Sequence, residues 1–62
     1  MNEKYKIDLE QETDGRWIAE IDALSGAMVY GKTPEQAIRK VEALALRILA
    51  DRLERDEVAE DF

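Results

Sequence analysis

Residues 33–55, TPEQAIRKVEALALRILADRLER, form the stretch that decides the fold. Thr33 is a good N-cap, Pro34 suits the first helical position, and Gln36 completes a T-x-x-Q capping box. No glycine or second proline follows in this stretch, and alanine, leucine, arginine and glutamate dominate it. We therefore predict one long helix from Pro34 to about Arg55.

The predicted helix carries more apolar surface than one small sheet can cover. One continuous arc contains Ile38, Val41, Leu44, Ala45, Ile48 and Leu49. Leu46 and Leu53 lie outside this arc, seven residues apart, and Leu49 lies between the two stripes. The apolar surface then spans roughly 200°, where roughly 100° is enough to cover one sheet. We interpret the surplus as a surface buried against a second subunit. The alternative is that Leu46 and Leu53 are singly exposed leucines, which are common.

Three short strands are predicted before the helix. Residues 4–10 alternate strictly between polar and apolar, which is typical of a half-buried strand. Asp14-Gly15 indicates a hairpin turn, and residues 16–21 and 27–30 form the second and third strands. We expect an α+β fold, a three-stranded antiparallel meander followed by one long helix in the order β-β-β-α. A single domain then spans residues 1–62, with a frayed tail at 57–62.

The second strand is informative about both faces of the sheet. Trp17, Ala19 and Ile21 alternate onto one side, where Trp17 is expected to be the main core residue beneath the helix. Ile18 interrupts the opposite, otherwise polar side, so that side is not expected to be wholly solvated. Stacking of Trp17 and Tyr30 on nucleic-acid bases is the alternative, and the net acidity of the chain argues against it.

Composition excludes several classes of function. The 62 residues include neither cysteine nor histidine, which excludes disulfides, thiolate metal sites and the commonest general base. Nine basic and fifteen acidic residues give a net charge of −6, so direct nucleic-acid binding is not expected. No apolar run approaches the length of a membrane span, and the N-terminus lacks the apolar region of a signal peptide. We expect a cytoplasmic protein with no cofactor.

Carboxylates are the main candidates for chemistry. Asp8 and Glu10 share the outer side of the first strand, and Glu20 can lie beside them on the second. Three oxygen ligands of this kind can hold a divalent ion weakly, as in a magnesium-dependent nuclease. The simpler interpretation is a solvated strand face. Ser25, the sole serine, has no histidine to activate it. We therefore predict no catalytic, cofactor or metal residues, and a non-enzymatic protein.

Protein–protein contact is the function that the residues favour. A 62-residue chain without disulfides or a metal gains stability most readily from a partner subunit. The interface candidates are Leu46, Leu49 and Leu53, with Met28 or Tyr30 nearby if the third strand is a sheet edge. An acidic surface suits a basic protein partner, or simply solubility.

The segment at residues 26–37, GAMVYGKTPEQA, resembles the G-x-x-x-x-G-x-T-x-E-E-A segment of HicB-like antitoxins. Upstream, residues 14–21, DGRWIAEI, are similar to the D-G-G-Y-V-A-E-V strand of that family. Residues 21–26, IDALSG, stand where the family has V-P-D-L-P-G. The resemblance covers roughly residues 4–55. These motifs mark turns, a helix cap and a core, and their joint order is more specific than any one of them.

The resemblance implies a partial RNase H-like fold that dimerises or forms higher oligomers. In the family this domain sequesters a small basic HicA-type mRNA interferase through its protein surface, so no catalytic residues carry over. Family members usually continue into a fourth strand and a DNA-binding domain. Val58 to Phe62 is short and acidic, Ala27 stands where a cysteine is common, and no helix-turn-helix or ribbon-helix-helix pattern follows. The alternative function is therefore a solitary oligomeric accessory or scaffold protein with no toxin partner.

Overall fold

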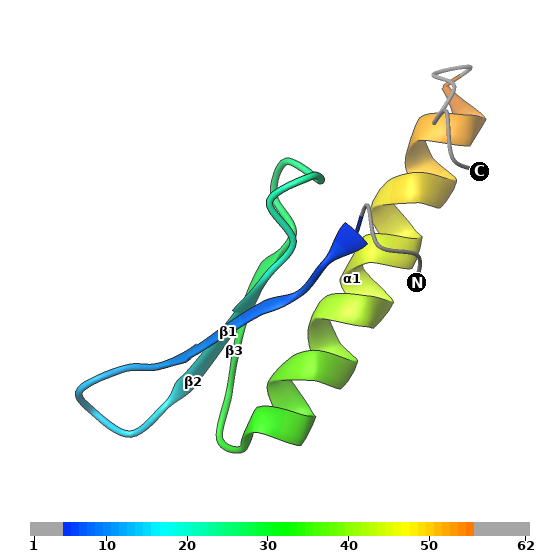
Figure 1. The fold of residues 1–62 in the computed structure, drawn as a ribbon. Helices are drawn as coiled ribbons and strands as arrows, with labels where there is room; N and C mark the ends of the chain where they lie inside the picture. Colours follow the sequence, from blue (N-terminus) through cyan, green and yellow to red (C-terminus); the bar gives the residue numbers. More distant parts are fainter. Residues whose placement is uncertain (1–4, 56–62) are drawn as a thin grey trace.

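The computed structural model of the protein describes residues 5–55. Three strands, β1 (Asp8–Gln11), β2 (Trp17–Glu20) and β3 (Met28–Gly31), precede one helix, α1 (Pro34–Glu54). The strands form an antiparallel sheet in the order β1-β2-β3, and α1 lies along one face of it (Figure 1). The predicted α+β meander followed by a long helix is confirmed. The tail expected at residues 57–62 lies outside the described residues.

The first strand is shorter than its alternating sequence predicts. Its ladder begins with the pair Asp8–Glu20, because the chain turns immediately after β2. The backbone N–H of Leu24 donates to the carbonyl of Ile21 at 3.0 Å, which closes that turn. The residues before Asp8 therefore have no β2 partner. Tyr5 and Ile7 nevertheless keep the alternation, because both pack against the core.

The start of α1 follows the predicted capping pattern. The hydroxyl Oγ1 of Thr33 accepts a hydrogen bond from the backbone N–H of Gln36 at 3.0 Å. The Gln36 side chain reaches back and accepts from the backbone N–H of Lys32 at 2.6 Å, one residue before the N-cap. Glu35 adds a negative charge in the first turn, where it favours the helix dipole. The end of β3 and the beginning of α1 are thus joined by a fixed corner.

The core consists largely of small side chains, which lets α1 approach the sheet closely. It is formed by Ala19, Ile21, Leu24 and Ala27 from the sheet side and by Ala37, Val41, Ala45 and Leu49 from the helix. Ile21 and Val41 are its largest fully buried side chains. The prediction that Trp17 is the main core residue is wrong, because Trp17 is only half-buried and packs against the edge of this cluster. Trp17 is the first residue of β2 and pairs with Gly31 at the end of the sheet, so its side chain borders the cluster instead of filling its centre.

Gly31 marks the closest approach of sheet and helix. A Cβ atom at this position would lie 2.6 Å from the backbone nitrogen and 2.9 Å from the Cα of Ala37. Carbon atoms do not come this close to backbone without a shift of the chain. Glycine at position 31 is therefore a packing requirement, and it fixes how β3 leads into α1.

Candidate interaction surfaces

The sheet has one face beneath α1 and one face open to solvent. Buried Ala19 pairs with Leu9 on one side and Val29 on the other, so this row faces the helix. The alternate rows face away from it. They are Asp8–Glu20–Met28 and Glu10–Ile18–Tyr30, which together define the outer face. Two of the predicted interface residues, Met28 and Tyr30, therefore lie on the outer face.

The outer face combines an apolar centre with an acidic margin. Met28 is 48% exposed and Tyr30 is 38% exposed, and Ile18 lies between β1 and Tyr30 as a half-buried residue. On the β1 side there is a shallow hollow of about 310 Å³. It is lined by four carboxylates and two apolar side chains, which are Asp8, Glu10, Glu12 and Glu20 with Leu9 and Ile18. A surface with this composition matches a partner that presents apolar side chains beside positive charge.

Ile18 and Arg16 complete the outer face and are not among the predicted interface residues. The sequence signal for Ile18 is its position on the otherwise polar side of the second strand. The Arg16 guanidinium lies over the ring of Tyr30, with its central carbon 4.3 Å from the ring centroid. This cation–π contact depends on the pairing of the two strands, which places Tyr30 beside Ile18. The sequence holds no local signal for such a cross-strand contact.

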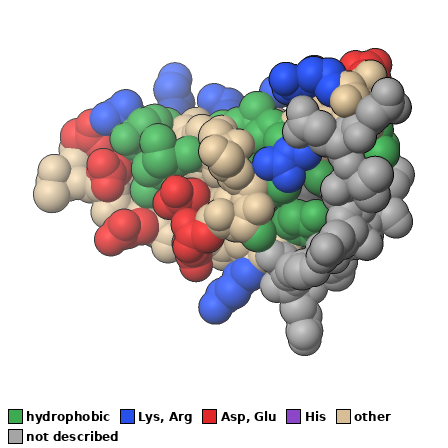
Figure 2. All heavy atoms as spheres, turned by 90° about the horizontal axis from the view of Figure 1, so that it is seen from above, with side chains coloured by type: hydrophobic (Ala, Val, Ile, Leu, Met, Phe, Trp, Pro, Cys, Tyr) green, Lys and Arg blue, Asp and Glu red, His purple; other side chains and the backbone are tan. Residues whose placement is uncertain are grey.

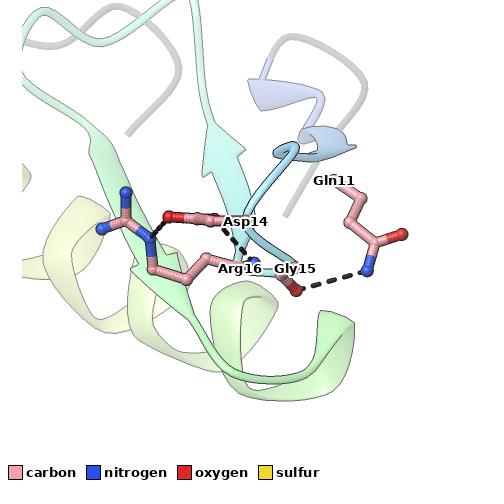
Figure 3. A network of polar contacts seen from close by, with 4 residues as sticks. All are labelled: Gln11, Asp14, Gly15 and Arg16. Carbon is pink, nitrogen blue, oxygen red and sulfur yellow. Dashed lines mark hydrogen bonds and ion pairs between the residues drawn. The ribbon is translucent and has the colours of Figure 1, made fainter.

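The β1–β2 hairpin holds Arg16 in place (Figure 3). Asp14 accepts hydrogen bonds from both the backbone N–H of Arg16 at 3.0 Å and its guanidinium Nε at 2.8 Å. Gln11 donates from its side-chain amide to the carbonyl of Gly15 at 3.2 Å. The backbone N–H of Arg16, assisted by its guanidinium, lowers the pKa of the Asp14 carboxyl. The hairpin therefore carries a fixed ion pair next to the apolar centre of the outer face.

The free edge of β3 is occupied by groups of the chain itself. The Lys40 ammonium donates to the carbonyl of Tyr30 at 3.3 Å. At one end of the strand the N–H of Met28 donates to the carbonyl of Gly26 at 3.0 Å, and just beyond the other end the N–H of Lys32 donates to Gln36. Because a sheet edge binds another strand through such groups, β3 is a poorly available edge.

The predicted leucines of α1 divide into two kinds. Leu46 is 62% exposed and Leu53 is 41% exposed, and these two define the helix flank. Leu49 is only 7% exposed and belongs to the core, so little of it remains for a partner. The helix flank and the outer face lie on different sides of the sheet, because α1 covers the inner face. The five predicted interface residues are thus not brought together into one surface.

Charged and apolar side chains are unevenly distributed on the molecular surface. Figure 2 shows a face on which apolar side chains lie between a group of acidic side chains and several lysine or arginine side chains.

Among residues 5–55, no group of three or more acidic side chains is arranged to hold a metal ion. Within the same residues, no helix combines the length and the apolar character needed to cross a membrane.

Comparison of the chain with protein-family models, with curated proteins and with solved structures finds no match. The resemblance to HicB-like antitoxins accordingly stays a prediction that rests on the motifs of residues 14–37. The function of the chain is therefore inferred from its two surfaces and from that resemblance.

Proposed function

We propose that this protein is a non-enzymatic, cytoplasmic protein-binding module. In this proposal it is a HicB-like antitoxin that self-associates and neutralises a small basic HicA-type mRNA interferase. The observation that carries the proposal is the outer face, where Ile18, Met28 and Tyr30 form an apolar centre beside a carboxylate-lined hollow. The class of the partner is inferred from the resemblance of residues 14–37 to HicB-like antitoxins, because that family binds HicA-type interferases.

The outer face has the properties that a binding site for a basic protein requires. Its apolar residues come from two neighbouring strands, so a rigid scaffold holds them in fixed positions. The carboxylates of Asp8, Glu10 and Glu20 lie on one side of that centre. Complementary charge at the margin of an interface speeds association and selects the partner, while the buried apolar centre supplies most of the affinity.

Self-association is supported by the helix flank. Leu46 and Leu53 are large apolar residues that remain exposed although the core is small. A chain of 62 residues buries only about 60% of its unfolded surface, so covering these leucines adds needed stability. Because the helix flank and the outer face are separate, the same chain can bind a second copy and a basic partner at the same time.

The test is binding of the wild-type chain to a small basic protein encoded beside its gene, measured by calorimetry. Glu10→Lys/Glu20→Lys reverses two charges on the outer face, and we expect it to weaken binding at least about tenfold. Glu35→Lys/Glu54→Lys makes the same change in net charge at exposed positions of α1, which lies on the opposite face of the sheet, and it should bind like wild type. Failure of the wild-type chain to bind any such neighbour would overturn the proposal and favour the solitary accessory protein.

A further inference from the structure

A second hollow of the surface is lined by cations, and no carboxylate of residues 5–55 lines it. It has a volume of about 240 Å³ and lies where the end of β3 meets the start of α1. Its lining residues are Arg16, Tyr30, Gly31, Lys32, Gln36 and Lys40. We call it the basic hollow, and the carboxylate-lined hollow on the β1 side the acidic hollow. In a chain with a net charge of −6, the basic hollow is a local reversal of charge.

Contacts within the chain hold two of the cations beside the basic hollow. The Arg16 guanidinium lies over the Tyr30 ring and donates from Nε to Asp14 at 2.8 Å. The Lys40 ammonium donates to the carbonyl of Tyr30 at 3.3 Å. A guanidinium has five N–H donors and an ammonium has three, so each contact uses only part of what is available. Within the described part of the chain the remaining N–H groups of both side chains are open to an acceptor in the hollow.

The third cation, Lys32, has an ammonium that bonds to no group of residues 5–55. Its backbone N–H is taken, because it donates to the side chain of Gln36. The N–H of Gln36 is taken as well, since it donates to the Thr33 hydroxyl. The start of α1 is thus capped by its own side chains. An anion in the hollow would therefore be bound by the side chains of Arg16, Lys32 and Lys40, with the positive end of the helix dipole nearby.

The basic hollow is continuous with the outer face. Tyr30 lines the hollow and also belongs to the apolar centre of that face. Ile18, the strand partner of Tyr30, lines the acidic hollow. Neighbouring strands lie about 4.8 Å apart, which separates β1 from β3 by only about 10 Å. Because a standard interface covers about 800 Å² on each protein, one partner on the apolar centre reaches both hollows.

The charges favour a protein carboxylate over a nucleic-acid phosphate as the occupant. A nucleic acid at this site would also meet the carboxylates of Asp8, Glu10 and Glu20, which repel a polyanion. A folded protein can present one carboxylate at the basic hollow and cations opposite the acidic one. The volume of about 240 Å³ is smaller than the roughly 300–1,000 Å³ of small-molecule pockets, and it suits a side chain of a larger surface.

We propose that the basic hollow receives an aspartate or glutamate side chain of the same basic protein that covers the outer face. The contact surface of that partner is then bipolar, with cations opposite the acidic hollow and one carboxylate among Arg16, Lys32 and Lys40. Turning the partner around on the face would place like charges together at both hollows, so the two hollows select a single orientation. The inference rests on the proposed function and adds the orientation in which the partner binds.

The sign of a charge effect tests this contact by calorimetry with the small basic protein encoded beside the gene. Lys32→Glu/Lys40→Glu makes the chain more acidic, so long-range attraction to a basic partner alone would tighten binding. The proposed contact predicts the opposite, a complex at least about tenfold weaker than that of wild type. Lys32→Glu alone should weaken binding at least about threefold, and its ammonium has no bond within residues 5–55 to lose.

A matched control separates local from long-range charge. Arg39→Glu/Arg47→Glu makes the same change in net charge at exposed positions of α1 that do not line the hollow. It should bind as tightly as wild type or more tightly, and circular dichroism verifies the fold of every variant. Each acidic residue of the partner is also changed to lysine, one at a time. One of these changes should restore at least about tenfold of the affinity lost by Lys32→Glu/Lys40→Glu, because opposite charges then meet again.

The outcomes distinguish this contact from the proposed function. An affinity that Lys32→Glu/Lys40→Glu leaves unchanged or raises would overturn the contact and leave the proposed function standing, as would a partner in which no change to lysine restores binding. NMR titration of the wild-type chain with a short oligouridine should not shift the amides of Gly31 and Lys32. Shifts that the double variant loses would assign the hollow to phosphate instead. A wild-type chain that binds no neighbour would remove the proposed function and the contact with it.

Discussion

Replacement of Gly31 by alanine tests the packing that fixes the fold. The added Cβ would lie 2.6 Å from the nitrogen, 2.9 Å from the Cα and 3.1 Å from the Cβ of Ala37. The two shortest contacts are with backbone in the first turn of α1, so no side-chain rotation relieves them. Either β3 or the helix start must shift, and overpacking of this kind costs about 1–3 kcal/mol.

That cost is large for a chain of this size. Stabilities of about 0.05–0.15 kcal/mol per residue give roughly 3–9 kcal/mol for 62 residues. In urea, with an m-value of about 1 kcal/mol per molar, the unfolding midpoint of Gly31→Ala should fall by about 1–3 M. Fluorescence of Trp17 and circular dichroism both report the transition.

A second substitution separates backbone contacts from side-chain contacts. Ala37→Gly in the Gly31→Ala background removes the Cβ of position 37 but leaves its nitrogen and Cα in place. The double variant should therefore recover no stability and should lose about 1 kcal/mol more, because glycine is a poor helix former. A midpoint of Gly31→Ala within about 0.5 M of wild type, or full recovery in the double variant, would refute the close backbone approach as the reason for glycine.

Three further changes have defined outcomes. Thr33→Ala removes the cap of α1 and should lower the free energy of unfolding by about 1 kcal/mol in urea titrations; no measurable loss would contradict the role of the hydroxyl. An NMR titration of the Asp14 carboxyl should give a pKa below that of an ordinary aspartate, and Arg16→Ala should raise it only in part, since alanine keeps the backbone N–H that is the main cause. Because folding lowers this pKa, Asp14 stabilises the folded protein at pH values above its unfolded-state pKa. This stabilisation is lost as the pH falls through its folded-state pKa. Asp14→Asn should therefore flatten the dependence of the free energy of unfolding on pH below about pH 4.

The element order was predictable because its signals are local. The cap at Thr33, the Asp14-Gly15 turn and the alternation around Leu9 each depend on neighbours in sequence, and each lies where expected. The ends of β1 were less predictable. A strand ends where its partner ends, and the turn that begins at Ile21 cuts the ladder short of residues 5–7.

The core and the candidate surfaces depend on contacts between distant residues. Trp17 is the largest apolar side chain of the sheet, yet it lies at the end of β2 and only borders the core, whose centre is formed by residues such as Ala19 and Ile21. Leu24 belongs to a connection in the sequence, but its loop folds back and buries it. On α1, periodicity separates Leu46 and Leu53 from the core correctly, since both are exposed. It does not reveal that Met28 and Tyr30 lie on the opposite side of the sheet from them.

The most direct test of the protein as a self-associating module is its solution mass by light scattering. Leu46→Glu/Leu53→Glu places two charges on the helix flank. Ala43→Glu/Ala50→Glu places two charges at the same spacing on exposed positions of the far side of α1. We predict a dimer or larger assembly for wild type and for the alanine variant, and a folded monomer, verified by circular dichroism, for the leucine variant. A wild type that is monomeric at all concentrations, or a leucine variant that assembles like wild type, would contradict the role of the helix flank.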